Sequence, residues 1–440
     1  MKIPKPPLLS EEDLPSIIKD ISQDPQLLDT LKQSVNNYDY WTKVKEQYIR
    51  LGYNPVRIWQ GVKFLREVKD YRYLSATDIN GQKYKYVLTD KMLNQLKQVE
   101  RDTAGKLKVS GSIEIDRQKY LVSSLIEEAI ASSQLEGAAT TRKVAKNMII
   151  SGRKPRDRSE RMILNNYRTM ESILKWKDLD MSRELLLSIQ ELITPGTLED
   201  PNDIGRFRSP KDKIKIWHED VVLHTPPEPI KMHKDLDAFI AYANSPEEEE
   251  TFSHALIKAS VLHYWLAYIH PFCDGNGRTA RAVFYWYMLK QDYWLFKYLS
   301  VSLTIKKSAK QYTAAFLKTQ YDDNDLGYFL NYSFDTVQKS ILKFHNHLDI
   351  WTKQLQELQK QESKLINYNQ RQAELLKYLY EHPDSEITIK IHQFKQGVVY
   401  QTARTDILEL VERGLLYVDH KRRRESVYRG ATKKIEQLFM

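Results

Sequence analysis

The pattern of apolar and polar positions predicts a mainly α-helical chain that contains two β-hairpins. Apolar residues recur every three or four positions through most of the sequence, the spacing of amphipathic helices. A period of two replaces it in residues 71–88, where Asn80-Gly81 favours a two-residue hairpin turn. The same change occurs in residues 214–223, around a polar turn at 218–220.

A regular apolar seam follows in residues 336–366, which we expect to form one linker helix. Its apolar positions step alternately by four and three residues, as in a coiled coil. Such a seam needs a partner surface, which is either the chain's own core or a second subunit, so a homodimer stays an open alternative. The seam consists of Val337, Ile341, Phe344, Leu348, Trp351, Leu355 and Leu358.

Residues 367–440 are predicted to form a separate module. Helices are expected over 372–380 and 402–413, with a short element over 387–394 between them and strands over 415–418 and 426–428. This order resembles a winged helix-turn-helix. If the module binds DNA, three residues face the major groove, and four basic residues between the strands lie along the phosphates. These residues are Gln401, Arg404 and Thr405, and Lys421, Arg422, Arg423 and Arg424.

The charge of this module leaves its partner open. Residues 366–440 hold 13 Lys and Arg against 10 Asp and Glu, although the whole chain has a net charge of +9. A basic surface is the first requirement for binding nucleic acid, and this one is modest. Winged helices also contact proteins, so DNA and protein remain alternative partners.

The run HPFCDGNGRTAR, from His270 to Arg281, concentrates the candidate chemistry of the chain. Pro271 ends the apolar helix before it, and a helical pattern resumes after Gly277. Because Gly275 and Gly277 have no Cβ, backbone N–H groups can approach an anion at the positive end of the second helix. The run therefore predicts a phosphate-binding loop between two helices.

The side chains of this loop suit phosphoryl-type transfer. Arg278 and Arg281 lie three residues apart, so a helix places both guanidinium groups on one face, where they can bind phosphate oxygens. Asp274 is a hard oxygen ligand of the kind that binds Mg²⁺ together with substrate phosphates. His270 is the side chain whose ordinary pKa suits proton abstraction near neutral pH.

The pattern HPFxDGNGRxxR is complete here and resembles the signature of the Fic (Fido) family, whose members mostly transfer AMP from ATP to a hydroxyl side chain of a target protein. The resemblance implies ATP as substrate, Mg²⁺ as cofactor, and a partner protein, or the enzyme itself, that offers a Ser, Thr or Tyr hydroxyl. It implies that His270 is the general base and that Asp274 holds Mg²⁺. The nucleotide-binding residues that it implies are Gly275, Asn276, Gly277, Arg278, Arg281 and Tyr312.

A second motif, SSQLEG, ends the helical stripe of residues 121–137, which the resemblance identifies as the inhibitory helix. It resembles the Fic inhibitory motif, with Ser132, Glu136 and Gly137 at its defined positions. The resemblance implies that Glu136 pairs with Arg281 and keeps the γ-phosphate of ATP away from it. In some relatives the same glutamate positions the water that removes AMP from the target, so the direction of the reaction stays open.

The hairpin around residues 214–223 is expected to be the flap that covers the active site in Fic proteins and pairs with an extended target segment. The residues expected to contact the target are Ile214, Lys215, Ile216 and Trp217. Gly205 and Arg208 match the GxxR element that precedes the flap in the family. A surface hairpin without a partner is the alternative.

Size and composition suggest several domains. The chain has 440 residues, a mass of 51.9 kDa and 41% hydrophobic residues. We expect an N-terminal helical extension with a hairpin (1–110), a Fic-type helical core (111–335), the linker helix and the C-terminal module. No apolar stretch approaches 18 residues, and the single cysteine, Cys273, cannot form an internal disulfide, so the expected location is cytoplasmic, without a membrane.

Two functions from different classes are consistent with the sequence. One is a protein adenylyltransferase, and the other is a DNA-binding transcriptional regulator with a nucleotide-sensing core. Transfer of UMP or phosphocholine is a further alternative, because the loop recognises phosphates and says little about the base.

Overall fold

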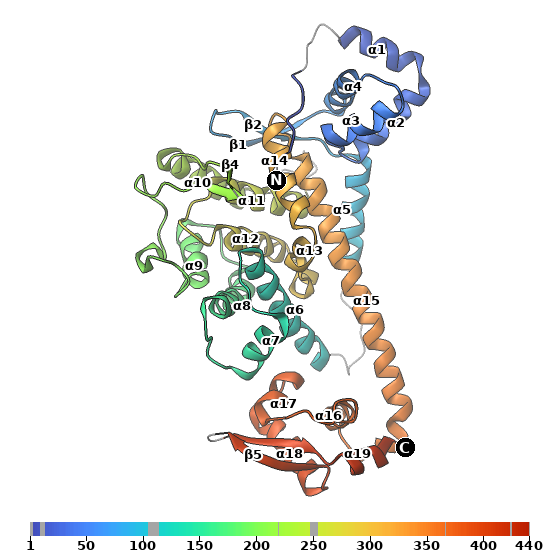
Figure 1. Cartoon of the computed structure of the whole chain (residues 1–440), viewed down its shortest axis with the longest axis vertical. Coiled ribbons are helices and arrows are strands. Elements are labelled where there is room, and N and C mark those ends of the chain that lie inside the picture. Colours follow the sequence, from blue (N-terminus) through green and yellow to red (C-terminus); the bar gives the residue numbers. More distant parts are fainter. Residues whose placement is uncertain are drawn as a thin grey trace.

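The computed structural model describes residues 3–8, 14–103, 114–218, 220–246, 254–365, 367–422 and 425–439. Helices dominate, and the strands of these residues form three separate two-stranded sheets, as the sequence pattern predicted. Figure 1 shows an elongated molecule in which the long helix α15 (Gly327–Leu365) runs from the N-terminal and central helices down to the C-terminal module. No helix of the described residues is long and apolar enough to cross a bilayer.

The N-terminal unit is a group of short helices followed by the predicted hairpin. Helix α4 starts at Pro55, and the Asn54 side chain caps it by accepting hydrogen bonds from the N–H groups of Val56 and Arg57. Gly81 has a φ of 82° in the hairpin turn, which favours glycine. The elements are α1 (Leu14–Gln23), α2 (Pro25–Asn36), α3 (Trp41–Arg50), α4 (Pro55–Val68), β1 (Arg72–Thr77), β2 (Lys83–Tyr86) and α5 (Asp90–Thr103).

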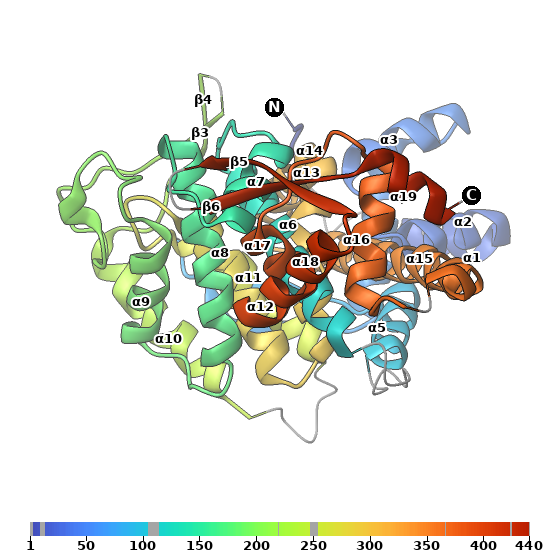
Figure 2. The same ribbon diagram turned by 90° about the horizontal axis from the view of Figure 1, so that it is seen from below.

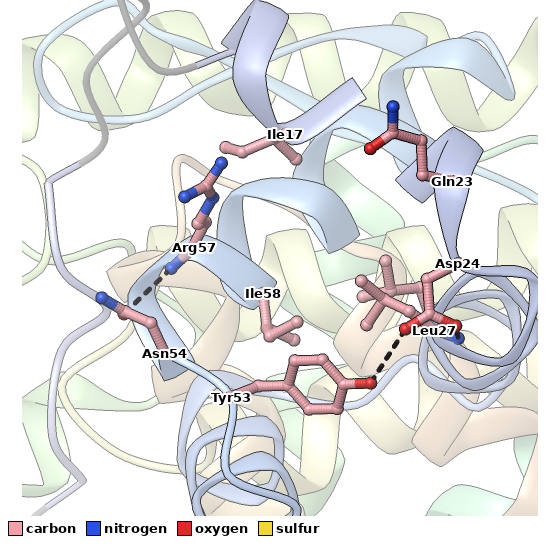
Figure 3. A pocket seen from close by; sticks show the side chains of 9 residues that line it. Ile17, Gln23, Asp24, Leu27, Tyr53, Asn54, Arg57 and Ile58 are labelled. Atoms are coloured by element: carbon pink, nitrogen blue, oxygen red, sulfur yellow. Dashed lines mark hydrogen bonds between the residues drawn. The ribbon is translucent and has the colours of Figure 1, made fainter. Parts of the chain in front are cut away.

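A cavity of about 310 Å³ lies among α1, α2 and α4 in this unit. Figure 3 shows the Tyr53 hydroxyl, which donates a hydrogen bond to Asp24 at 3.1 Å on one side of it. The residues that line this cavity include none of the predicted site residues. The cavity therefore belongs to the N-terminal unit and not to the phosphate-binding loop.

A buried network of charged and hydroxyl groups connects the N-terminal unit to residues at the start of α15. Arg66 of α4 is 0% exposed and donates hydrogen bonds to the Tyr328 hydroxyl at 2.7 Å and to the Asp325 carboxylate at 3.3 Å. The Tyr38 hydroxyl donates to the same carboxylate at 2.6 Å. Because buried charges are costly unless paired and hydrogen bonded, this network specifies how the two parts dock.

The central part is built around the helices α11 and α12, which the loop from His270 to Gly275 joins. Almost every side chain of both helices is buried, because neighbouring helices surround the pair. The elements of this part are α6 (Glu114–Leu135), α7 (Arg142–Ser151), α8 (Arg158–Trp176), α9 (Arg183–Ile193), the 3-10 helix η3 (Pro201–Asp203), β3 (Ile216–His218), β4 (Val221–His224), α10 (Pro229–Asn244), α11 (Ala255–Ile269), α12 (Asn276–Lys290), the 3-10 helix η4 (Trp294–Tyr298), α13 (Val301–Lys307) and α14 (Ala309–Tyr321).

Helix α15 (Gly327–Leu365) is continuous across the boundary expected at residue 335. Val337, Ile341 and Phe344 of the predicted seam are buried in the chain's own core, and Leu348 packs against the same core. The side chains of the other three seam residues lie outside the described part. The first half of the seam thus has its partner within the chain.

The C-terminal module has the predicted order of three helices and two strands: α16 (Gln370–Glu381), α17 (Ile389–Gln396), α18 (Tyr400–Glu412), β5 (Leu416–Arg422) and β6 (Glu425–Gly430), followed by α19 (Thr432–Phe439). Ile387 also pairs with Tyr428 through two backbone hydrogen bonds. Figure 2 shows β5 and β6 crossing in front of the central helices in the view from below. Its assignment as a winged helix stays a prediction.

One sequence expectation was wrong in this module, and one helix was missed. Lys421 and Arg422 were expected in the loop between the strands, but they belong to β5, because the hairpin pairing continues to Arg422 and Glu425. Arg423 and Arg424 lie outside the described residues. Helix α19 was not predicted, although Ile435 buries itself in the module's core.

The buried network around Arg66 provides a stability test. Replacing Arg66 with methionine leaves the Asp325 carboxylate buried without its cation, so we expect the variant to lose roughly 3–5 kcal/mol of stability. Urea unfolding followed by tryptophan fluorescence measures this loss, since Trp59 lies 5.6 Å from the guanidinium carbon. Lys32→Ala, which removes an exposed ion pair, is the control and should change little. An equal effect of both variants would contradict this role of the network.

Candidate active site

The loop between α11 and α12 is held in shape by its own residues. His270 ends α11 in the left-handed conformation, with a φ of 51°, and Gly275 starts α12 with a φ of 87°. The Asn276 side chain accepts a hydrogen bond from the Phe272 N–H at 2.9 Å and donates one to the Phe272 carbonyl at 2.8 Å. The side chain of Asn276 is therefore engaged within the loop.

The GxxR element supports the loop from outside. The Arg208 side chain donates to the His270 carbonyl at 2.8 Å, and its backbone N–H donates to the Pro271 carbonyl at 2.9 Å. Phe207 stacks on Phe272, with ring centroids 5.4 Å apart. Sequence reasoning recognised this element without a role, and the structure shows that it anchors the loop.

His270 faces a cavity of about 210 Å³. Its Nδ1 lies 3.3 Å from the Ala267 carbonyl, which can only accept, so Nδ1 carries the proton and Nε2 keeps a lone pair. Burial is the main cause that lowers the pKa of His270 to about 4. The imidazole is thus neutral at physiological pH, the state that a general base requires.

Glu136 and Arg281 form an ion pair at the edge of this cavity. The Arg281 Nη2 donates to the Glu136 carboxylate at 2.9 Å and to the Ser132 carbonyl at 3.0 Å. The Arg281 Nε donates to the Ser132 hydroxyl at 2.9 Å. The structure therefore brings the two motifs together, although they are 145 residues apart in sequence.

The charges of this pair stabilise each other. Burial opposes ionisation of Glu136, but the neighbouring Arg281 and Arg278 outweigh it and hold the pKa of Glu136 below its usual value. A Cβ on Gly277 would lie 2.2 Å from the Glu136 carboxylate. The absence of a Cβ on Gly277 therefore lets the carboxylate reach Arg281, in addition to the role predicted for this glycine in the phosphate-binding loop.

Arg278 offers donors that the protein leaves unused. It is 1% exposed, and its Nη1 donates to the Ile193 carbonyl at 3.1 Å. Its Nε and Nη2 atoms are buried without a hydrogen-bond partner among the described residues. Buried donors without partners are costly, so an anion bound beside Gly275 would satisfy them.

Asp274 is the carboxylate of the loop that solvent and ligands can reach. Its side chain is 40% exposed and lies 3.6 Å from Arg158 and 3.8 Å from Arg278. A single accessible carboxylate beside donors for phosphate fits a Mg²⁺ ion that keeps most of its ligands from substrate and water. The residues present are therefore compatible with the expected cofactor.

Helix α14 forms another wall of the cavity. Tyr312 lines it, and its hydroxyl lies 2.8 Å from the His263 Nε2. His263 is buried in the core, and burial lowers its pKa to about 3. Phe316 and Leu317 add apolar surface, so this wall can accept an aromatic base.

The predicted flap is present but shorter than expected. Ile216 and Trp217 lie in β3, whereas Ile214 and Lys215 precede it, because the Ile214 N–H turns back to the Asp212 carbonyl. Ile216 lines the cavity, and Trp217 is 58% exposed. Of the four expected contact residues, two therefore belong to a regular strand.

Two residues of this region were missed from the sequence. His224 of β4 bonds through Nε2 to the Tyr268 carbonyl at 2.8 Å and ties the flap to α11. Glu128 of α6 is buried and accepts hydrogen bonds from the Tyr285 hydroxyl at 2.8 Å and the Ser302 N–H at 2.9 Å, while burial raises its pKa. The only signal was that Glu128 lies one helical turn before Ser132.

Known proteins with a similar sequence agree with this geometry. The Fic/DOC family profile matches residues 180–288. A protein adenylyltransferase Fic of Nematostella vectensis is 41% identical over 81 residues, which are 18% of this chain and 17% of that protein. Its namesake in Drosophila grimshawi is 28% identical over 142 residues, which are 32% of this chain and 26% of that protein. The chain thus matches about a quarter or less of either relative's length.

The fold of the chain is also similar to that of a Fic family protein. A crystal structure of a Fic family protein from Desulfovibrio desulfuricans G20 superimposes with a TM-score of 0.51 at 20% identity, covering 79% of this chain and 97% of that one. This likeness concerns the fold alone. Residues 180–288 thus match the Fic/DOC family and contain the complete loop motif, and the fold is similar to that of a Fic family protein.

The state of His270 can be measured directly. Because burial lowers its pKa to about 4, we expect its ring to stay neutral from pH 8 down to pH 5.5, whereas an unperturbed histidine titrates near 6.5. NMR of protein with labelled histidine, with the signal assigned by its loss in His270→Ala, measures the charge. A midpoint near 6.5 for this signal would show that the imidazole is not desolvated.

Proposed function

We propose that this protein is a protein adenylyltransferase that transfers AMP from ATP to a Ser, Thr or Tyr hydroxyl of a target protein or of itself. The observation that carries the proposal is a neutral His270 that faces the cavity, at the end of a loop whose following helix carries Arg278 with two unsatisfied donor atoms near its N-terminus. The names of the Nematostella and Drosophila relatives support the same activity.

In this reaction the His270 Nε2 accepts the proton of the target hydroxyl. The hydroxyl oxygen then bonds to the α-phosphorus of ATP, while the bond from that phosphorus to the pyrophosphate oxygen breaks. Arg278 and the backbone N–H groups of the loop stabilise the negative charge on the phosphates. Asp274 would hold Mg²⁺, which when bound neutralises phosphate charge.

Glu136 restrains this chemistry in the proposed resting state. Arg281 is the cation that should receive the γ-phosphate, and its Nη2 and Nε atoms are already bonded to Glu136 and Ser132. A carboxylate and a phosphate repel each other and compete for one guanidinium. ATP then binds in a pose that does not place the α-phosphate for attack, until Glu136 moves away.

Glu136→Gly should therefore increase AMP transfer by about tenfold or more, since removing a competing charged contact is worth roughly 1.4 kcal/mol or above. His270→Ala should abolish transfer and leave ATP affinity nearly unchanged. Mass spectrometry after incubation with ATP, UTP or CDP-choline identifies the added group and the modified peptide. Equal labelling by wild type and Glu136→Gly would contradict the restraint, and an added mass from another donor would correct the substrate.

Sequence-specific DNA binding is a second candidate function, favoured by the exposure of Gln401, Arg404 and Thr405 on one side of α18. If these side chains read bases, Arg404→Ala should weaken binding by about 1–3 kcal/mol, while the catalytic variants leave it unchanged. An electrophoretic shift assay of the full chain on genomic fragments tests this. The absence of any shift at low salt, where phosphate contacts are strongest, would exclude DNA as the partner.

A further inference from the structure

The C-terminal module packs directly on the helix that precedes Glu136. Figures 1 and 2 both place α17 next to α6 and α7, and residues of α17 contact both helices. Phe394 makes this contact: it packs against a small buried cluster formed by three helices of the central part. That cluster consists of Ile126, Ala129 and Ile130 of α6, Ala145, Met148 and Ile149 of α7, Met162 and Ile163 of α8, and Ala138.

Residues on both sides of Glu136 pack into this cluster. Ile130 precedes the glutamate and Ala138 follows it, and both are buried there. The Ala138 N–H donates to the Ser133 carbonyl at 3.0 Å, and the Ser133 hydroxyl donates to the Met162 carbonyl at 3.2 Å. A change in the packing of the cluster therefore shifts the carboxylate relative to Arg281.

Helix α17 is in turn fixed to the rest of its module. His392 of α17 and Asp406 of α18 are almost fully buried, with the His392 Nε2 3.2 Å from the carboxylate. Arg371 of α16 donates to both oxygens of the same carboxylate, at 2.7 and 2.8 Å. A bidentate pair and a buried imidazole around one carboxylate hold the three helices as one body.

Among the described residues, Phe394 is the only apolar residue from outside the central part that packs against this cluster. The Glu136 hydrogen bonds to Ser133 and Arg281 lie within the central part, so they do not connect the glutamate to the C-terminal module. Phe394 provides this connection. It belongs to the C-terminal module, whose three helices move as one body, and it packs against the cluster that holds the segment around Glu136.

We propose that Phe394 is a positioning residue for Glu136, so that the C-terminal module acts as a second clamp on the inhibitory helix. This inference rests on the proposed adenylyltransferase function and extends its regulation. The docked module favours the Glu136–Arg281 pair, and any loosening of α17 from the cluster releases the glutamate and raises AMP transfer. Because the clamp acts through the position of one carboxylate, it should change how often the active state forms and leave the chemistry of that state unchanged.

The test uses the full chain. Phe394→Ala should raise AMP transfer roughly three- to tenfold, because truncating a partly buried aromatic side chain weakens the clamp without removing Glu136. Phe394→Leu keeps most of the apolar volume, so its AMP transfer should lie between that of wild type and that of Phe394→Ala. Val399→Ala, on the 68% exposed start of α18, is the matched control and should behave as wild type.

A double variant shows whether the effect passes through Glu136. In the Glu136→Gly background, Phe394→Ala should add nothing to AMP transfer, because the clamped group is gone. Hydrogen exchange of residues 126–138 should become faster in Phe394→Ala, while exchange in α16 shows whether the module stays folded. If α16 unfolds, Phe394→Leu decides in place of the alanine variant.

The outcomes of these experiments separate a failure of the clamp from a failure of the proposed function. If Glu136→Gly is active but the Phe394 variants change neither AMP transfer nor exchange of residues 126–138, the clamp is wrong and the proposed function stands. An increase that persists in the Glu136→Gly background also overturns it. If Glu136→Gly transfers no AMP, the proposed function fails, and hydrogen exchange alone still decides whether Phe394 holds the helix.

Discussion

The ion pair between Glu136 and Arg281 is the contact to which the rest of the site is arranged. It joins two motifs that are 145 residues apart and brings a carboxylate to the N-terminal end of α12, where the loop is otherwise built for anions. Gly277 permits the approach because it lacks a Cβ. The same region holds a neutral imidazole, unsatisfied guanidinium donors and an accessible carboxylate.

The free-energy cost of desolvating the Glu136–Arg281 pair explains why several contacts hold its surroundings in place. A desolvated guanidinium and a partly buried carboxylate need a fixed geometry, since a small displacement leaves a charge unpaired in a poorly hydrated environment. Glu128 fixes α6 against α12 and α13, and the cluster of α6, α7 and α8 fixes the segment after Glu136. The C-terminal module reaches the same cluster through Phe394, so parts distant in sequence converge on one carboxylate.

Motif spacing and periodicity predicted many of the helices, strands and turns of this fold. The helix, loop and helix around Gly275 and Gly277, the hairpin at Asn80-Gly81, and the order of elements after residue 370 all follow from local rules: proline and glycine end helices, and a period of two marks strands. These rules act within a few residues, so they also hold in the folded chain. They do not limit how far a strand pairs or a helix continues, and for this reason the ends of β5 and the extent of α15 differ from expectation.

The sequence by itself determined the chemistry that the loop can perform, because the residue types of HPFCDGNGRTAR and their spacing are local properties. Only the tertiary structure decided how those residues are used. It engages Asn276 within the loop, leaves two atoms of Arg278 unsatisfied, and lowers the pKa of His270 by burial. It also packs Phe394 against the cluster that α6 forms with α7 and α8. These features depend on desolvation and on contacts between distant segments, which exist only when the chain is folded.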